Sequence, residues 1–209
     1  MSWSYLSTFV CALKLSRRLN ALSPGFPRKQ ESIIDYLLEH LETINGKYIP
    51  INLHPRTYES EAFFGTIEMS NSKVDIFYDR NRNRCWRRFI LTKELCHILY
   101  DTPNSQHLAS TPEQIGSLLT QILAGLAAAD FTKDHAASSE QATILMAIEV
   151  LLPQSERENV TKMMSKGANT LDIAKHYLLP EQMVSVFLDR HYAALMAEVT
   201  KDFDKSGDR

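Results

Sequence analysis

Apolar side chains recur at helical spacing along most of the chain, but one stretch has a different rhythm. Between residues 48 and 78 the apolar positions gather in short runs separated by polar turn residues, a pattern typical of strands. The segment EMSNSKV joins the last two runs and predicts a hairpin, so we expect a small, mostly antiparallel sheet. The predicted strands cover residues 48–53, 63–69 and 73–78. The predicted helices cover residues 3–20, 29–44, 84–100, 112–129, 138–152, 156–166, 170–177 and 181–200.

The predicted helix over residues 84–100, RCWRRFILTKELCHILY, is apolar on most of its surface. Leu91, Leu95 and Ile98 form one apolar side of this helix. A helix of this kind belongs in the middle of a domain, because water would contact apolar groups on every exposed face. The pattern therefore predicts an α+β fold, mostly helical, with a small antiparallel sheet packed on a buried central helix and a helical C-terminal part.

The ends of the chain differ from its middle. The segment SPGFP at residues 23–27 interrupts the helical pattern and sets apart an amphipathic N-terminal helix, which we expect to pack on the body of the protein. We predict an accessory helix at residues 1–24, a main domain at residues 25–200 and a charged tail at residues 201–209. The N-terminal apolar run has no basic residue before it and is interrupted by Lys14, unlike a secretory signal.

Composition adds two expectations about location. No apolar run approaches the roughly 20 residues of a membrane-spanning helix, so we expect no membrane contact. The three cysteines form no close pair, which is typical of a reducing compartment. These observations predict a cytoplasmic protein.

Charge is balanced over the whole chain but clustered in one segment. The 23 basic and 25 acidic residues argue against a surface that coats nucleic acid. Five arginines nevertheless lie within nine residues, and they form a candidate phosphate or nucleic-acid patch: Arg80, Arg82, Arg84, Arg87 and Arg88. The alternative is a solvated loop and first helical turn whose charges Asp75 and Asp79 balance.

The run Lys93-Glu94-Leu95-Cys96-His97 carries the candidate chemistry. In the zinc motif HExxH, two histidines on one helix face hold the metal and the glutamate acts as general base. Lys93 stands at the position of the first histidine, and its ammonium has no lone pair to offer a metal. From the residues alone, the simpler interpretation is that Glu94 forms an ion pair and His97 is a hydrogen-bonded core histidine.

A longer pattern surrounds this run. The segment RRFILTKELCHILYD, preceded by the strands AFFGTIEM and KVDIFYD, resembles the ImmA/IrrE family of metallopeptidase-like proteins. The helix EQATILMAIEVLLPQSER is similar to the family's E-x-x-A-N-x-F-A-x-x-LLMP segment, and LDIAKHYLLPEQMVSVFLDR is similar to its C-terminal helical pair. The resemblance covers about residues 29–192 and implies a zincin-like fold.

The resemblance also implies roles for individual residues. Glu94 stands at the general-base position and His97 at the second metal-ligand position. The third ligand would be a glutamate near Ala142, and the nearest acid is Glu140. Because one histidine and one carboxylate fall short of the three protein ligands of catalytic zinc, we expect a degenerate site without a resident cofactor. We predict instead that Lys93 pairs with Glu140 across two packed helices, so that an ammonium replaces the cation.

The implied function is regulatory. Members of the family act on, or alongside, helix-turn-helix repressors in stress responses and mobile elements, so the resemblance implies a protein partner, such as a repressor of this kind. With a degenerate site we expect a partner-binding pseudo-enzyme whose binding region lies around Lys93, Glu94 and His97. Two alternatives stay open. One is a zinc-dependent endopeptidase that uses His97, Glu140 and a third ligand not identified from the sequence, and the other is a DNA-binding regulator that uses the arginine cluster or the C-terminal helices.

Overall fold

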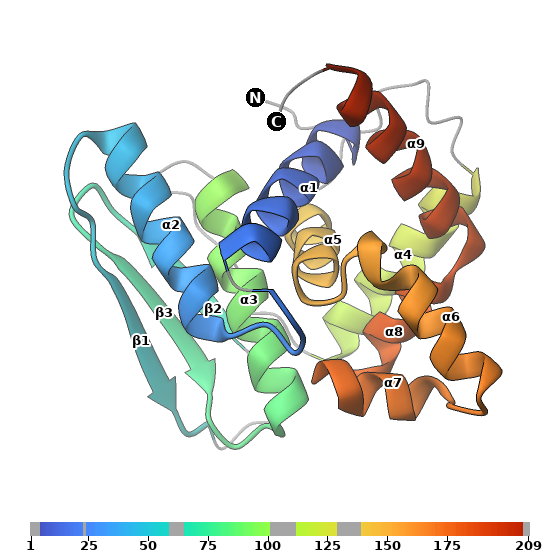
Figure 1. Ribbon diagram of the computed structural model, residues 1–209. Helices are drawn as coiled ribbons and strands as arrows, with labels where there is room; N and C mark the ends of the chain where they lie inside the picture. The colour runs from blue at the N-terminus through green and yellow to red at the C-terminus, as the bar shows by residue number, and fades with distance from the viewer. Residues whose placement is uncertain (1–4, 23, 59–64, 101–111, 129–138, 207–209) are drawn as a thin grey trace.

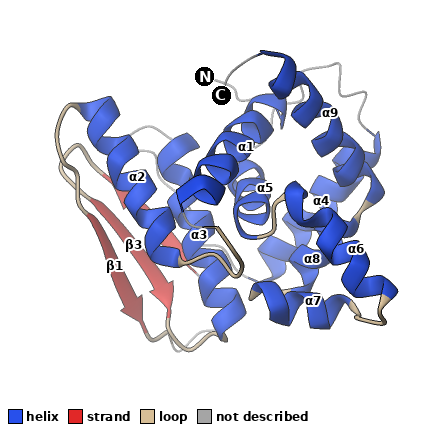
Figure 2. Ribbon diagram, in the orientation of Figure 1, coloured by secondary structure: helices blue, strands red, loops and turns tan. Residues whose placement is uncertain are grey.

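The computed structural model describes residues 5–22, 24–58, 65–100, 112–128 and 139–206, and Figure 1 shows how the elements are arranged. In chain order these elements are α1 (Tyr5–Leu22), α2 (Gln30–Asn45), β1 (Ile51–Arg56), β2 (Gly65–Met69), β3 (Val74–Asp79), α3 (Arg84–Tyr100), α4 (Pro112–Ala128), α5 (Ser139–Leu151), α6 (Arg157–Ser165), α7 (Thr170–Tyr177), α8 (Glu181–Leu188) and α9 (Arg190–Ser206). Figure 2 shows that the strands lie together at one side of a mostly helical molecule. The predicted α+β class, dominated by helix, is therefore confirmed.

The described sheet is mixed, with the strand order β1-β3-β2. Strands β2 and β3 form the predicted antiparallel hairpin, in which Ile67 lies opposite Ile76. Strand β1 pairs with the other edge of β3 in parallel, with Leu53 opposite Ile76. The expectation of an antiparallel sheet is therefore wrong for β1. A hairpin can be predicted from its local turn, whereas a parallel pair is made by tertiary contacts between strands that are separated in sequence.

The sheet presents one apolar face and one polar face. Val74 and Ile76 of β3 are buried on the same side as Ile67 of β2, and β2 and β3 both contact α3. Because side chains alternate along a strand, Asp75 and its partners on the adjacent strands, Asn52 and Glu68, lie on the opposite side. Strand β1 includes Pro55, which the ladder tolerates because β1 is an edge strand.

Helix α3 lies between the sheet and α5 (Figure 1). Its residues 89–98 are all buried, as predicted for a central helix. Helix α5 is equally enclosed from Ala142 to Leu151, because α1 and α3 both pack on it. The core is therefore built around two helices rather than one, and the candidate site lies between them.

The N-terminal helix packs on the body of the protein, as expected. Helix α1 contacts α5, α9 and α2, and its buried Phe9, Leu15 and Leu19 belong to the same hydrophobic core as the rest of the chain. In the part of the chain that the structure describes, no helix has the combination of length and apolar character needed to cross a membrane.

The helix predicted over residues 181–200 is wrong as a single element, because the chain turns at Asp189. This residue has an extended conformation, with ψ 136°. Its Oδ1 accepts hydrogen bonds from the backbone N–H groups of His191 (2.8 Å) and Tyr192 (3.2 Å), so it caps the start of α9. Helix α9 then continues to Ser206 and buries Phe203.

Candidate functional site

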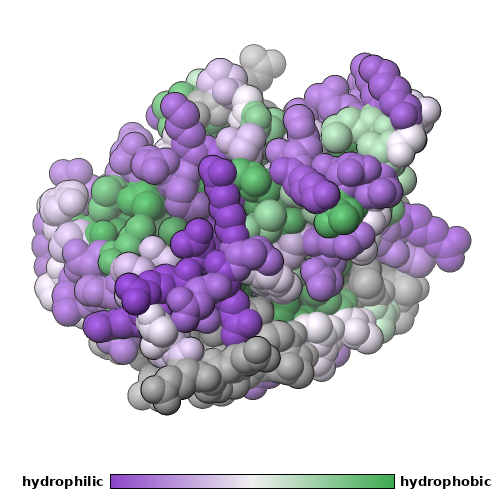
Figure 3. All heavy atoms as spheres, turned by 90° about the horizontal axis from the view of Figure 1, so that it is seen from below, coloured by the Kyte–Doolittle hydropathy of each residue, from purple (hydrophilic) through white to green (hydrophobic). Residues whose placement is uncertain are grey.

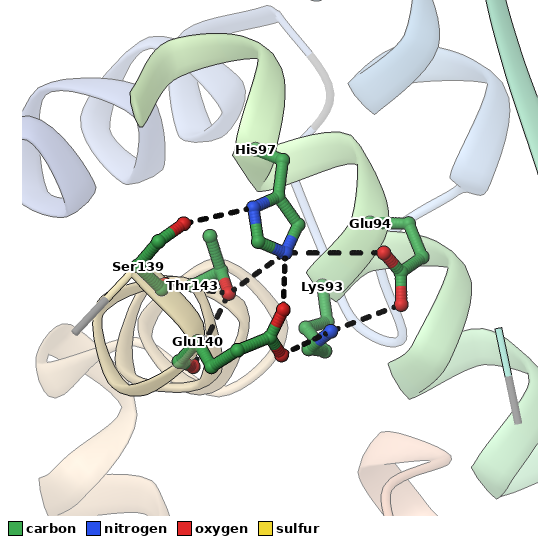
Figure 4. A network of polar contacts seen from close by, with 6 residues as sticks. All are labelled: Lys93, Glu94, His97, Ser139, Glu140 and Thr143. Atoms are coloured by element: carbon green, nitrogen blue, oxygen red, sulfur yellow. Dashed lines mark hydrogen bonds and ion pairs between the residues drawn. The ribbon is translucent and has the colours of Figure 1, made fainter. Parts of the chain in front are cut away.

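Helices α3 and α5 bring the candidate residues together in one cluster of charged and polar side chains (Figure 4). The Nζ atom of Lys93 lies 3.0 Å from Oε1 of Glu94 and 2.7 Å from Oε2 of Glu140. The predicted pair between Lys93 and Glu140 is therefore present. Glu140 reaches the cluster although it lies two residues before the position that the family pattern would give.

His97 is the fourth member of this cluster. Its Nε2 atom lies 3.4 Å from Oε1 of Glu140 and 3.8 Å from Oε2 of Glu94. The hydroxyl of Ser139 lies 3.2 Å from Nδ1, and the hydroxyl of Thr143 lies 3.3 Å from Nε2. The imidazole is thus held by α5 on both ring nitrogens, as the hydrogen-bonded core interpretation predicts.

Ser139 and Thr143 were missed by the sequence interpretation, although the sequence contains a signal for them. They stand at positions i and i+4 of α5, a helix whose residues from Ala142 to Leu151 are all buried and are apolar except for Thr143 and Glu149. Polar residues on one face of such a helix need hydrogen-bond partners inside the protein. His97 supplies this partner.

The helix spacing and one close approach of the sheet position the cluster. Lys93 and His97 are four residues apart and therefore point from the same face of α3 toward α5. Strand β2 lies against α3 at Gly65, where a Cβ atom would meet Cγ2 of Ile90 at 2.5 Å and Oε1 of Glu94 at 3.3 Å. Glycine thus allows the strand to close the side of the cluster that holds Glu94.

The cluster is enclosed. The side chains of Lys93, Glu94 and His97 are at most 1% exposed, whereas Glu140 keeps 24% of its side chain exposed. Glu140 is therefore the member of the cluster with most access to the surroundings.

Opposite charges keep Lys93 and Glu140 ionised. Burial disfavours the ammonium of Lys93, but the charges of Glu94 and Glu140 outweigh it and raise its pKa above the ordinary value. Burial alone would raise the pKa of Glu140, but hydrogen bonding and charge from His97 and Lys93 lower it to about 2. Lys93 and Glu140 therefore form a true ion pair at neutral pH.

The zinc ion implied by the ImmA/IrrE resemblance does not fit this set of donors. The ammonium of Lys93 lies within hydrogen-bonding distance of both carboxylates, where a cation would have to be. A protonated amine cannot ligate a metal, and its charge repels one. Among the described residues, no group of three or more His, Cys, Asp or Glu side chains has an arrangement that could hold a metal ion.

The acidic residues predicted to balance the arginine cluster behave differently from each other. Asp79 pairs with Arg82, whose Nε lies 3.1 Å from Oδ2. Asp75 instead binds Lys73 at 2.6 Å and His54 at 2.9 Å on the polar face of the sheet. These two partners lower the pKa of Asp75 to about 2. The balance expected for the arginines is therefore only partly present.

The five arginines of the candidate patch have different contacts. Arg80 donates from Nε to the hydroxyl of Thr57 at 2.7 Å, and Arg82 is held by Asp79. The remaining three line a pocket at the beginning of α3: Arg84, Arg87 and Arg88. Sequence interpretation missed the other wall of this pocket, residues 27–31, because the contact between the starts of α2 and α3 is tertiary.

The C-terminal helical pair shows packing rather than a basic surface. In α8 the apolar side chains are buried against the body of the protein: Met183, Val184, Val186 and Phe187. Its exposed positions include Glu181, Gln182 and Ser185. A helix that reads DNA faces phosphates, and an acidic exposed face opposes that role.

Neither a scan against models of protein families nor a search of curated proteins finds a match to this chain. Its function is therefore inferred from the site between α3 and α5.

Proposed function

We propose that this protein is a regulatory, partner-binding relative of the ImmA/IrrE metallopeptidases, and that its metal site has become an internal ion pair. A single observation carries the proposal. The ammonium of Lys93 lies between Glu94 and Glu140, 3.0 and 2.7 Å from their oxygens, at the position where a peptidase would need its cation.

The order of the elements supports the family assignment and a zincin-like fold. Helix α2 is followed by a small sheet, and α3 then carries the degenerate HExxH run. Helix α5 supplies Glu140 and is followed by the LLP segment, Leu151 to Pro153, that belongs to the resemblance. Helices α7 and α8 stand where the family has its C-terminal helical pair.

The chemistry of the cluster favours binding over cleavage. In a zinc peptidase the glutamate of HExxH takes a proton from a water molecule that the metal has made acidic. Here the carboxylate of Glu94 holds an ammonium, which is a hydrogen-bond donor and offers no coordination site to water. Peptide hydrolysis by that route would lack its nucleophile, a water molecule activated by the metal.

A protein partner is the remaining role that the resemblance implies. We propose a repressor of the helix-turn-helix type as this partner, in a cytoplasmic regulatory system of a stress response or a mobile element. The free state of Cys11, Cys85 and Cys96 supports a reducing location. The side chain of Glu140, which is 24% exposed, marks the point at which the cluster is most accessible to a partner.

Metal analysis of the purified protein tests the degenerate site. The full chain is equilibrated with zinc, desalted and measured by mass spectrometry of the metal, beside a His97→Ala variant. We expect far less than one zinc per chain, and the same value for the variant. Stoichiometric zinc that disappears in His97→Ala would overturn the pseudo-enzyme and establish the zinc endopeptidase.

Mixing with a repressor tests the regulatory role. A helix-turn-helix repressor from the same organism is purified and combined with the full chain, with priority for one whose gene proves to lie beside this one. We expect a stable complex by size-exclusion chromatography and an unchanged repressor mass after incubation with zinc. Cleavage of the repressor, or failure to form a complex, would contradict the proposal.

DNA binding would support the other alternative. Fluorescence anisotropy with a labelled duplex at moderate salt measures this directly. We expect no measurable binding to the duplex, and therefore no dependence of affinity on salt, because the exposed positions of α8 include an acid. A steep salt slope that depends on the arginine cluster would favour a DNA-binding regulator.

A further inference from the structure

A second site of polar side chains lies at the beginning of α3. A pocket of about 340 Å³ lies between the first turns of α2 and α3 and extends to Leu178, the residue that follows α7. Pro27, Tyr78 and Leu91 contribute apolar and aromatic surface to its lining. The volume falls within the range of roughly 300–1,000 Å³ that is usual for small-molecule sites.

The pocket carries a strong excess of positive charge. One acidic side chain, Glu31, lines it together with five basic ones: Arg28, Lys29, Arg84, Arg87 and Arg88. Figure 3 views the molecule from the side on which α3 begins, and strongly hydrophilic residues gather on that face. In a chain with a net charge of −2, such a local concentration attracts anions to one place.

Arg88 is the member of this group with two guanidinium nitrogens that are left without a hydrogen bond in the described part of the chain. Its Nε and Nη2 atoms are buried and have no hydrogen-bond partner among the described residues. Burial and the neighbouring Arg84 lower the pKa of its guanidinium to about 10, so it stays charged at neutral pH. By contrast, Arg28 is held by Ser16 and Asn20. Arg88 therefore presents donors that an anion in the pocket can occupy.

The start of α2 adds backbone donors to the same place. Helix α2 begins at Gln30, and the residue before it, Lys29, makes no side-chain capping hydrogen bond. The first N–H groups of a helix have no partner within the helix and carry the positive end of its dipole. Helix α3 also begins here, although Asn83 caps it by accepting from the N–H of Trp86 at 3.0 Å. Two helix starts and the guanidinium groups thus converge on one pocket.

We propose that this pocket binds a small phosphorylated molecule. A phosphate group carries two charges and several acceptor oxygens, which match the Arg88 guanidinium, the flanking Arg84 and Arg87, and the start of α2. Tyr78 and Leu91 then contact the organic part of the ligand. The site is independent of the Lys93 cluster and uses three of the five clustered arginines.

Isothermal titration calorimetry on the full chain tests this site with three probes: inorganic phosphate, pyrophosphate and adenosine monophosphate. We expect one site per chain and tighter binding of the nucleotide than of inorganic phosphate. Arg88→Met should weaken binding about tenfold or more, because a charge-assisted hydrogen bond is lost. Arg80→Met is the matched control, since Arg80 belongs to the same cluster but does not line the pocket, and it should bind normally.

The outcomes separate the interpretations. No binding of any probe at millimolar concentration, or equal losses in the two variants, would overturn the proposal. Equal affinity for phosphate and nucleotide would overturn the role of the apolar wall. If Arg88→Met does not fold, the exposed Arg84→Gln takes its place and should also weaken binding. Duplex DNA that binds with a loss in Arg88→Met, while none of the three probes binds, would replace the small ligand with a nucleic acid.

Discussion

Removing the buried ammonium should destabilise the protein strongly. In a Lys93→Met variant the side chain keeps a similar length but leaves Glu94 and Glu140 without their shared cation. Glu94 is 1% exposed, so water cannot reach its carboxylate to replace the stabilising ammonium. Breaking a buried ion pair by deleting one partner costs about 3–5 kcal/mol. For a chain of this size each kcal/mol shifts Tm by about 2–4 °C, so we expect a loss of about 6–20 °C.

Urea unfolding at pH 7, followed by circular dichroism, measures the loss in free energy of unfolding, and a thermal scan measures the loss in Tm. Buffers contain a chelator, so that no adventitious cation replaces the ammonium. A matched variant adds Glu94→Gln and Glu140→Gln to Lys93→Met and should recover most of the stability, because no buried charge remains. A Lys93→Met protein within 1 kcal/mol of the wild type would refute the role assigned to the ion pair.

A Lys93→His variant examines the same position from the other direction. Two histidines four residues apart would then share one face of α3 with the carboxylate of Glu140 opposite. We expect this variant to be unstable in chelator and to gain stability on adding zinc, with one ion bound per chain by metal analysis. Absence of any zinc effect would show that α3 and α5 do not present a usable metal geometry.

Three further substitutions test a buried carboxyl group, a close contact of the sheet and a helix cap. Burial raises the pKa of Glu149 from its ordinary 4.5 to about 8, so between these values the folded chain holds a proton that the unfolded chain has lost. The free energy of unfolding should therefore fall as pH rises through this window, by up to about 1.4 kcal/mol per pH unit. The decline should be weaker in Glu149→Gln. Equal slopes for the two proteins, measured by urea unfolding at several pH values, would contradict this. Gly65→Ala should cost about 1–3 kcal/mol, because its Cβ would press on Ile90 at 2.5 Å, and an unchanged Tm would show that the strand can move away. Asp189→Ala should cost about 1 kcal/mol in chemical unfolding through loss of the cap on α9, whereas Asp189→Asn should retain most of the stability.

The sequence predicted the central parts of the fold well where local signals were strong. Helix α3 begins and ends at the predicted residues, because Asn83 caps its start and the apolar pattern is continuous from there. The pair between Lys93 and Glu140 was predicted from the need of a buried ammonium for a counter-charge. This argument needs only two packed helices and does not need their exact register.

The parts that were not predicted depend on tertiary contacts or on single residues. The parallel pairing of β1 is one such contact, because β1 joins β3 on the edge that the hairpin leaves free. The break between α8 and α9 depends on one side chain, Asp189, in a run that is otherwise favourable for helix. The pocket needs residues 27–31 to lie beside the first turns of α3, and no local pattern indicates that arrangement.

The covalent attachment of the cation to α3 has a consequence for the behaviour of the core. A bound metal ion dissociates when its free concentration falls below the dissociation constant, and the fold then loses the stability that binding supplied. The Lys93 amine is part of the chain and cannot dissociate from it, so below its raised pKa the positive charge is present at every metal-ion concentration. The stability of the contact between α3 and α5 is therefore independent of metal supply, because the cation is part of the amino-acid sequence.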